Sequence, residues 1–210
     1  MKDTLEVKNV DDWNSLLQNA KNGDIEAMNE VASMYRDGLT IDNIEIVRLD
    51  PQEEFNWTKK SYESGDPLGA ELYADYLSDG EYKYCEKNID LAIQLYEKAM
   101  NAGSGRAAYN MGLEYRNKGN FEKAFELYSK ANNSGSYYNG LIIGQCYYYG
   151  IGVKKDKRKA LKLFKSIDKD KCSQYEIDEV NYLNGKMYLE GEVIEQSLEK
   201  ARYYLELANI

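Results

Sequence analysis

Small and large residues recur three positions apart along this chain, and a glycine follows each pair. The pattern occurs five times, as Ala32, Tyr35 and Gly38; Ala74, Leu77 and Gly80; Gly112, Tyr115 and Gly119; Gly144, Tyr147 and Gly150; and Gly185, Tyr188 and Gly191. Positions three apart share one face of an α-helix, so the small residue allows a neighbouring helix to come close and the large residue fills the space beside it. The glycine stands where a left-handed residue would end the helix. The pattern predicts five helices of one kind.

A second apolar pattern alternates with the first and predicts a partner helix in each repeat. Ala124, Leu127 and Tyr128 are typical of it, and a residue that can cap a helix stands four positions before each copy. The capping residues are Asp50, Asn88, Asn120, Asp156 and Ser197. Their side-chain oxygens can accept hydrogen bonds from the free amides of the first helical turn.

Short connections between the predicted helices determine how they pack. A helix stop stands directly before a helix start at Gly23-Asp24, Gly65-Asp66, Gly103-Ser104 and Gly135-Ser136. The fourth repeat has Lys171 at this place, and we expect a capping box from Ser173 to Glu176 to begin the next helix. Such short connections force neighbouring helices to be antiparallel.

These elements predict an all-α fold. We expect a right-handed α-α superhelical solenoid of about five antiparallel helix pairs with an N-terminal half-repeat helix. Residues 1–210 would form a single domain, with the first helix over 12–22 and repeats over about 24–65, 66–103, 104–135, 136–171 and 173–210. The longest irregular stretch is 39–49, of unknown role, and the strand-like alternation of residues 44–49 predicts an extended arm.

The order of these residues resembles the Sel-1-like repeat, a longer relative of the tetratricopeptide repeat. The best copy contains Gly144, Tyr147, Gly150, Gly152, Val153, Asp156 and Ala160, and the resemblance covers about residues 12–210. Leu77 departs from the expected tyrosine, and Asn139 and Val180 stand where the family prefers alanine. The resemblance implies a non-enzymatic module that binds a protein partner in its concave groove as an adaptor or regulator. It implies no catalytic role for the repeat positions.

Composition narrows the choice of partner and compartment. The net charge of −9 disfavours nucleic acid and anionic membranes, and it would attract a basic protein. No apolar run approaches transmembrane length, and the N-terminus shows no signal-peptide pattern. Three cysteines without metal-type spacing fit a reducing compartment, so we expect a cytoplasmic protein. The abundance of lysine, asparagine, isoleucine and tyrosine favours a bacterial setting.

Candidate chemistry is sparse. The chain contains no histidine, which removes histidine-dependent triads and histidine metal sites. The glycines at 150 and 152 are not followed by the Gly-Lys-Ser/Thr sequence of a phosphate-binding loop. We therefore expect no catalytic residue, no metal and no cofactor. A hydrolase that uses only carboxylates is the enzymatic alternative.

The candidate binding residues lie on the first helix of each repeat, which lines the concave surface in tetratricopeptide-type stacks. Tyrosine and arginine are favoured at such sites because each joins apolar area to a polar end. Some of these tyrosines could instead pack between repeats. The predicted site comprises Tyr109, Leu113, Arg116, Leu141, Gln145, Tyr148, Tyr149, Tyr182 and Lys186.

Two further roles stay open at this point. An immunity protein or other inhibitor that neutralises a toxin would suit a short acidic chain as well as an adaptor does. The apolar C-terminal helix could pair with a copy of itself, which predicts a monomer or a weak homodimer through that helix.

Overall fold

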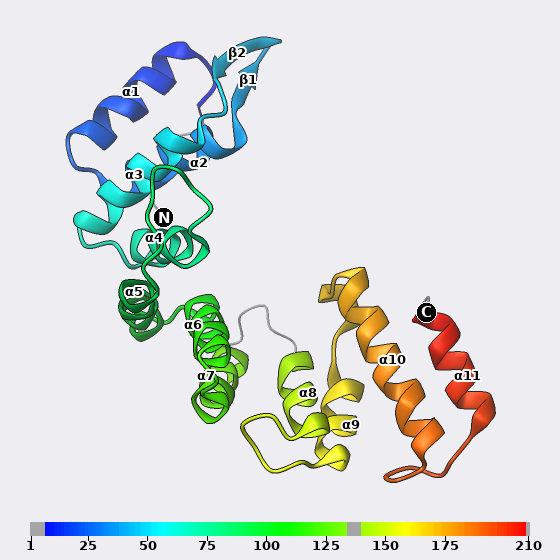
Figure 1. The fold of residues 1–210 in the computed structure, drawn as a ribbon. Helices are drawn as coiled ribbons and strands as arrows, with labels where there is room; N and C mark the ends of the chain where they lie inside the picture. The colour runs from blue at the N-terminus through cyan, green and yellow to red at the C-terminus, as the bar shows by residue number, and fades with distance from the viewer. Residues whose placement is uncertain (1–6, 134–139, 209–210) are drawn as a thin grey trace. The chain divides into compact units, whose positions relative to one another are not determined.

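The structure is a computed structural model that describes residues 7–133 and 140–208. Its elements are almost all helical (Figure 1). They are α1 (Val10–Lys21), α2 (Ile25–Asp37), β1 (Leu39–Ile41), β2 (Ile44–Val47), α3 (Pro51–Glu63), α4 (Pro67–Asp79), α5 (Ile89–Asn101), α6 (Gly105–Asn117), α7 (Phe121–Asn133), α8 (Leu141–Tyr149), α9 (Lys157–Ser166), a 3₁₀ turn at Lys169–Lys171, α10 (Gln174–Glu190) and α11 (Leu198–Leu207). The predicted all-α class is confirmed.

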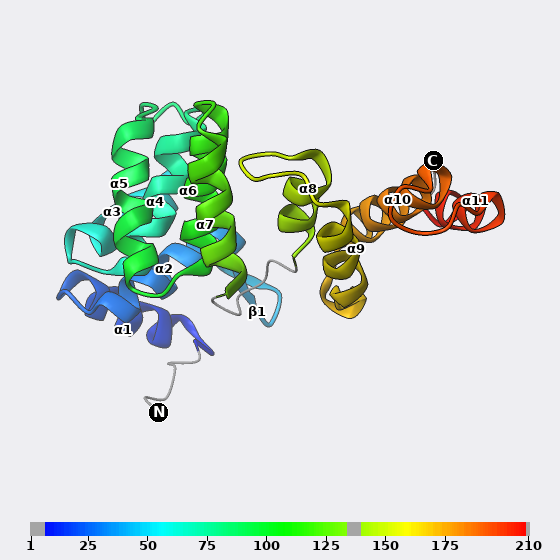
Figure 2. The same cartoon turned by 90° about the horizontal axis from the view of Figure 1, so that it is seen from below.

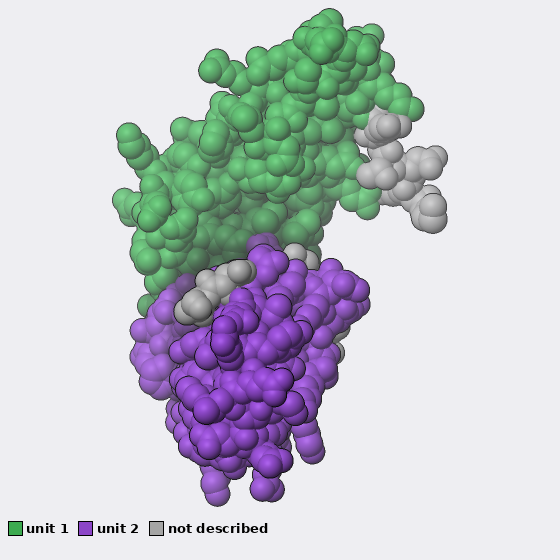
Figure 3. Space-filling view, turned by 90° about the vertical axis from the view of Figure 1, so that its right-hand side faces the viewer, with its two compact units in different colours: residues 1–102 green, residues 103–210 purple. Residues whose placement is uncertain are grey.

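The chain divides into two compact units, coloured separately in Figure 3. Unit 1 contains residues 1–102 and unit 2 contains residues 103–210. In unit 1, α2 packs on α3 and α4 packs on α5. In unit 2 the pairs are α6 with α7, α8 with α9, and α10 with α11. Within each of the last two pairs, the two helices lie side by side in both Figure 1 and Figure 2. The right-handed superhelix and the single domain stay predictions.

Helix starts follow the predicted caps. The Asp50 carboxylate accepts from the amides of Gln52 and Glu53, and Asn88 and Asn120 accept from the third residue beyond each of them. Asp156 and Ser197 do the same. The capping box between Ser173 and Glu176 is also present. The five caps and the capping box predicted from the sequence are therefore confirmed. The predicted stop and start at residues 135 and 136 lie outside the described residues.

Glycines in the first helix of three pairs bring the second helix close. A Cβ atom on Gly112 would stand 2.6 Å from Cε1 of Tyr128, and one on Gly144 would stand 2.3 Å from Cε1 of Phe164. At Gly185 the nearest atom would be Cγ of Leu205, at 2.8 Å. The interpretation that the small residue lets the neighbouring helix come close is confirmed at these positions.

The stretch predicted as an extended arm is instead one strand of a folded hairpin. β2 pairs antiparallel with β1, and the turn residues Asp42 and Asn43 have φ angles of 51° and 64°. Two consecutive positive φ angles match the tight turn that best fits strand twist. Val47, 3% exposed, joins a buried cluster with Trp13 and Trp57. The alternation was read correctly as strand, but only Val47 is buried against α1–α3, while Ile44 is 62% exposed.

The core of unit 2 lies between successive helices. One buried cluster joins α8, α9 and α10 and includes Phe164, Leu183 and Met187. Another joins α7 to α8 through residues that include Tyr128 and Cys146. None of the helices in the described ranges combines the length and the apolar character needed to cross a bilayer.

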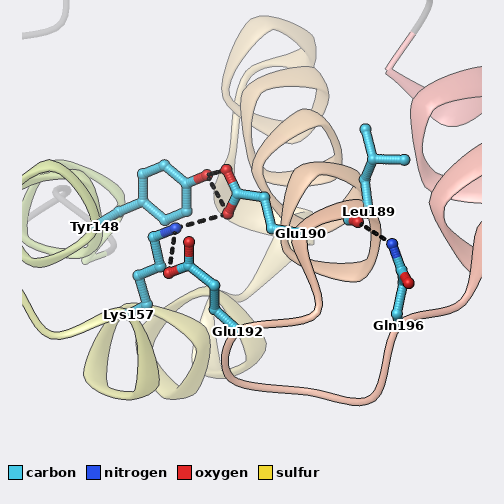
Figure 4. Close-up of polar contacts among 6 residues, drawn as sticks. All are labelled: Tyr148, Lys157, Leu189, Glu190, Glu192 and Gln196. Atoms are coloured by element: carbon cyan, nitrogen blue, oxygen red, sulfur yellow. Dashed lines mark hydrogen bonds and ion pairs between the residues drawn. The ribbon is translucent and has the colours of Figure 1, made fainter.

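An ion-pair cluster around the buried Lys157 ties α8 and α9 to α10 (Figure 4). The Lys157 ammonium lies 2.7 Å from Glu190 Oε2 and 2.8 Å from Glu192 Oε2, and the Lys157 side chain is 7% exposed. The Tyr148 hydroxyl donates to both Glu190 oxygens, at 3.0 and 3.1 Å. Burial by itself would raise the pKa of Glu190, but the hydrogen bonds from Lys157 and Tyr148 outweigh it and hold this pKa below its usual range. Burial would likewise lower the pKa of Lys157, and its two ion pairs instead raise it.

Substitution of Gly144 tests the closest helix approach. Gly144→Ala should lower the free energy of unfolding by about 1–3 kcal/mol, because overpacking outweighs the better helix propensity of alanine. Urea unfolding followed by circular dichroism measures the loss. Phe164→Leu in the same chain should relieve the clash, so the double variant should lose less than the two single losses combined. Strict additivity would contradict the contact.

Acid titration tests the ion-pair cluster. Because the folded-state pKa of Glu190 is depressed, its contribution is present above the unfolded pKa of about 4.3 and is lost as pH falls through the folded pKa. Glu190→Gln should therefore lower the free energy of unfolding by about 1–2 kcal/mol above about pH 5, and the difference from the parent should shrink below about pH 4. Urea unfolding across this pH range measures it.

Glu206→Gln is the matched control for this titration. Glu206 pairs with Arg202 on the surface of α11, where the two side chains are 63% and 82% exposed. Its removal should have little effect at any pH, since exposed pairs contribute little. A loss at Glu190 that is independent of pH would show that the cluster acts through packing alone.

Candidate partner-binding site

The nine predicted binding residues lie on three helices of unit 2. Helix α6 carries Tyr109, Leu113 and Arg116; α8 carries Leu141, Gln145, Tyr148 and Tyr149; and α10 carries Tyr182 and Lys186. They differ widely in exposure. The structure divides them into a partly buried group on α6, a buried pair on α8 and a connected group across α8 and α10.

The α6 group is half-covered by its own repeat and by the next one. Tyr109 and Leu113 are partly buried against the cluster that contains Tyr128 and Cys146, and the Tyr109 and Tyr128 ring centroids are 5.6 Å apart. Burial raises the pKa of Tyr109, and it raises the pKa of Tyr128 to about 12. Both phenols are therefore neutral near pH 7. Arg116 is exposed.

Two of the predicted residues are buried in the structure. Leu141 is 8% exposed and Tyr148 is 3% exposed, and both belong to the core cluster between α8, α9 and α10. The Tyr148 hydroxyl is also engaged by Glu190 (Figure 4). Side chains buried in this way have no surface to offer a partner.

The physical reason is the packing of the next repeat. Leu141, Gln145 and Tyr148 share one face of α8, as the sequence predicts, but α10 covers that face. Gln145 Nε2 donates to Glu179 Oε1 on α10 at 3.0 Å. Only Tyr149, one residue further along α8, lies at the uncovered edge, where it is 48% exposed.

Five residues form a connected surface at this edge, which we call the tyrosine–lysine surface: Gln145, Tyr149, Glu179, Tyr182 and Lys186. The Lys186 ammonium lies 5.9 Å from the ring centroid of Tyr149 and 5.6 Å from that of Tyr182. The buried ring of Tyr148 lies beneath, also 5.6 Å from the ammonium. Three aromatic rings thus surround one cation.

The electrostatics of this surface favour positive charge. Ring faces attract ammonium and guanidinium groups, most strongly where water is partly excluded. Burial raises the pKa of Tyr149, and the negative charges of Glu179 and Glu190 raise it further, so its hydroxyl is a neutral hydrogen-bond donor and acceptor. The arrangement can hold an alkylammonium over aromatic rings beside carboxylates.

Sequence reasoning missed the residues that hold Tyr148 in place next to this surface. Lys157, Glu190 and Glu192 are not part of any repeat pattern, and Lys157 is 33 positions from Glu190. One signal was available. Lys157 shares the helix face of Ala160, Leu161 and Phe164, and a charge on an otherwise apolar face indicates a buried ion pair.

The described residues also bear on metal binding. Within residues 7–133 and 140–208, no group of three or more Cys, Asp or Glu side chains has the placement needed to hold a metal ion. Cys85, Cys146 and Cys172 form no disulfide with one another. Burial raises the pKa of the Cys146 thiol to about 11.

Comparison with protein families gives one match, repeated along the chain. The model of the Sel1 repeat matches residues 25–66, 67–104, 105–136, 141–166 and 181–209. The resemblance inferred from the sequence is thereby confirmed. A search of curated proteins gave no match.

Solved structures with similar folds are Sel1-type proteins. A Sel1 repeat protein from Oxalobacter formigenes is 25% identical with a TM-score of 0.69, over 96% of this chain and 84% of that chain. A protective antigen of uropathogenic Escherichia coli with an SLR fold is 21% identical with a TM-score of 0.65, over 96% of this chain and 49% of that one. A protein described as a sel1 repeat protein from Klebsiella pneumoniae is 24% identical with a TM-score of 0.53, over 93% and 90% of the two chains.

The last two likenesses show the fold alone. The five matched repeats, which together span most of the sequence, carry more weight than any of the three structures. Sel1 repeats generally form helical solenoids that act as scaffolds for protein–protein interaction. The chain therefore belongs to the Sel1 repeat family.

Proposed function

We propose that this chain is a non-enzymatic adaptor or regulator that binds a basic segment of a protein partner on its tyrosine–lysine surface. Tyr109, Leu113 and Arg116 on α6 would extend the contact toward less basic parts of the partner. An inhibitor that neutralises a toxin would use the same surface and differ only in its target. Three cysteines without a disulfide among them favour a reducing compartment such as the cytoplasm for this interaction.

The supporting observation is the position of Lys186. Its ammonium occupies a place lined by three tyrosine rings at 5.6–5.9 Å, with Glu179 on the same helix. The surface thus already accommodates the chemical group that a basic partner would present. A lysine or arginine of the partner would replace Lys186 over the exposed ring of Tyr149, and the net charge of −9 would speed its approach.

Non-enzymatic action is supported by how the repeat residues are used. The recurrent glycines allow close helix packing, and the five capping residues begin helices. The recurrent positions therefore have structural roles. The chain has no histidine to act as a general base near neutral pH. Members of the family are generally non-catalytic interaction modules.

Removal of one ring and one charge tests the proposed surface. Tyr149→Ala with Glu179→Gln should weaken binding of a lysine-rich peptide by about tenfold or more, since buried aromatic anchors carry most interface energy. Fluorescence anisotropy with a labelled peptide measures this. Tyr203→Ala with Glu206→Gln on α11 removes the same groups from another exposed site and should leave affinity unchanged. Equal loss in both variants, at unchanged helical content, would reject the surface.

Substitution of the resident cation tests the mechanism. Lys186→Met should strengthen binding of the lysine-rich peptide by about threefold to tenfold, because the peptide no longer competes with an internal ammonium for the rings. The same anisotropy titration measures the gain. Weaker binding would mean that Lys186 itself contacts the partner, and that the partner's anchor is not a cation.

A further inference from the structure

Helix α9 has a charge opposite to that of the rest of the chain. Residues 154–171 contain nine of the 27 lysines and arginines but only three of the 36 acidic residues. Lys157, Ala160, Leu161 and Phe164 are buried on one side of α9. The exposed side carries four cations in succession: Arg158, Lys159, Lys162 and Lys165. We call these four residues the basic face of α9.

The basic face is not neutralised by the protein. Among the residues that the structure describes, none of its four cations forms an ion pair with a carboxylate, whereas Lys157 beside them holds Glu190 and Glu192. Lys159 lies 4.9 Å above the ring of Tyr147. The surface therefore presents positive charge to an incoming group.

Arg158, Lys159 and Lys162 work against the helix that carries them, whereas Lys165 in the last turn complements the helix dipole. The first turn of α9 contains Lys157, Arg158 and Lys159 and no acidic residue, although the positive end of the helix dipole favours acids there. Arg158 and Lys162 are four positions apart, and Lys162 and Lys165 are three apart, so like charges repel along one face. Residues that break local rules without a structural gain mark functional positions. Lys157 has such a gain, Lys159 has a contact with the Tyr147 ring, and Arg158 and Lys162 have no partner among the described residues.

A groove with an apolar floor runs beside the basic face. It has a volume of about 350 Å³ and lies between α7, α8 and α9, with Ile143, Tyr147 and Leu163 as apolar lining. Lys159 and Lys162 stand on its rim, and Ser129 and Asn132 of α7 line the other side. The combination suits a ligand that joins carboxylates to an apolar side chain.

We propose that the basic face of α9 docks a short acidic segment of a protein partner, with an apolar side chain of that segment in the adjoining groove. The site is distinct from the tyrosine–lysine surface and has the opposite charge preference. Unit 2 would then join a basic segment to an acidic one.

The charge of the whole chain favours a peptide over larger polyanions. Residues 1–102 hold 22 of the 36 acidic residues against 10 of the 27 basic ones. A nucleic acid or an anionic membrane is an extended polyanion that this excess would repel. A short acidic segment meets only the local field of α9, and the apolar groove adds a contact that phosphate groups cannot use.

Charge reversal on the full chain tests this proposal. A fluorescein-labelled glutamate-rich peptide with one central leucine should bind the parent, and Arg158→Glu with Lys162→Glu should weaken it by about tenfold or more. The same peptide without leucine should bind more weakly because it leaves the groove empty. The variant should unfold at an equal or higher temperature, since an acid then stands in the first turn of α9.

Lys200→Glu with Arg202→Glu on α11 makes the same change in net charge at an exposed site of the same unit. This control should retain the affinity of the parent within about twofold. The lysine-rich peptide should still bind the α9 variant, so that failure here is separable from failure of the proposed function. The proposal is overturned if the parent does not bind the acidic peptide saturably. It also fails if the control loses as much affinity, or if phosphatidylserine vesicles or duplex DNA bind the basic face more tightly than the peptide.

Discussion

The absence of a side chain at one position in the first helix of a pair determines how the later repeats of this molecule are built. At Gly112, Gly144 and Gly185 the partner helix approaches so closely that a methyl group would overlap Tyr128, Phe164 or Leu205. Each ring or branched side chain fills the space that glycine leaves, which fixes the separation of the two helices. The remaining faces of the first helices are then free to pack on the next repeat or to meet solvent.

Features set by neighbouring residues were predictable from the sequence. The caps at Asp50 and Ser173 and the close approach at Gly144 depend on local hydrogen bonds or on contacts inside one helix pair. The burial of Leu141 and Tyr148 was not predictable, because periodicity identifies their common face on α8 but not which helix covers it. Tyr149, one position along, was correctly expected to be exposed.

The cations of unit 2 fall into two groups, those with partners inside the protein and those that face solvent. Lys157 is buried and satisfied by Glu190 and Glu192, and Lys186 is satisfied by aromatic rings. Arg158 and Lys162, on the other side of α9, have no such partner among the described residues. The net charge of −9 conceals this division, which is why composition alone favoured a single basic partner. The arrangement of charges on individual helices is more informative than their sum.

The hairpin of β1 and β2 shows where this architecture tolerates extra sequence. It is inserted in the connection between the two helices of one pair, its base is held by Val47 in the core, and Asp42 and Asn43 at its tip are exposed. Chain added at such a tip does not change the helix spacing, since both strands return to the same place. The 42–43 turn is therefore a suitable place to graft a fluorescent reporter or an affinity tag.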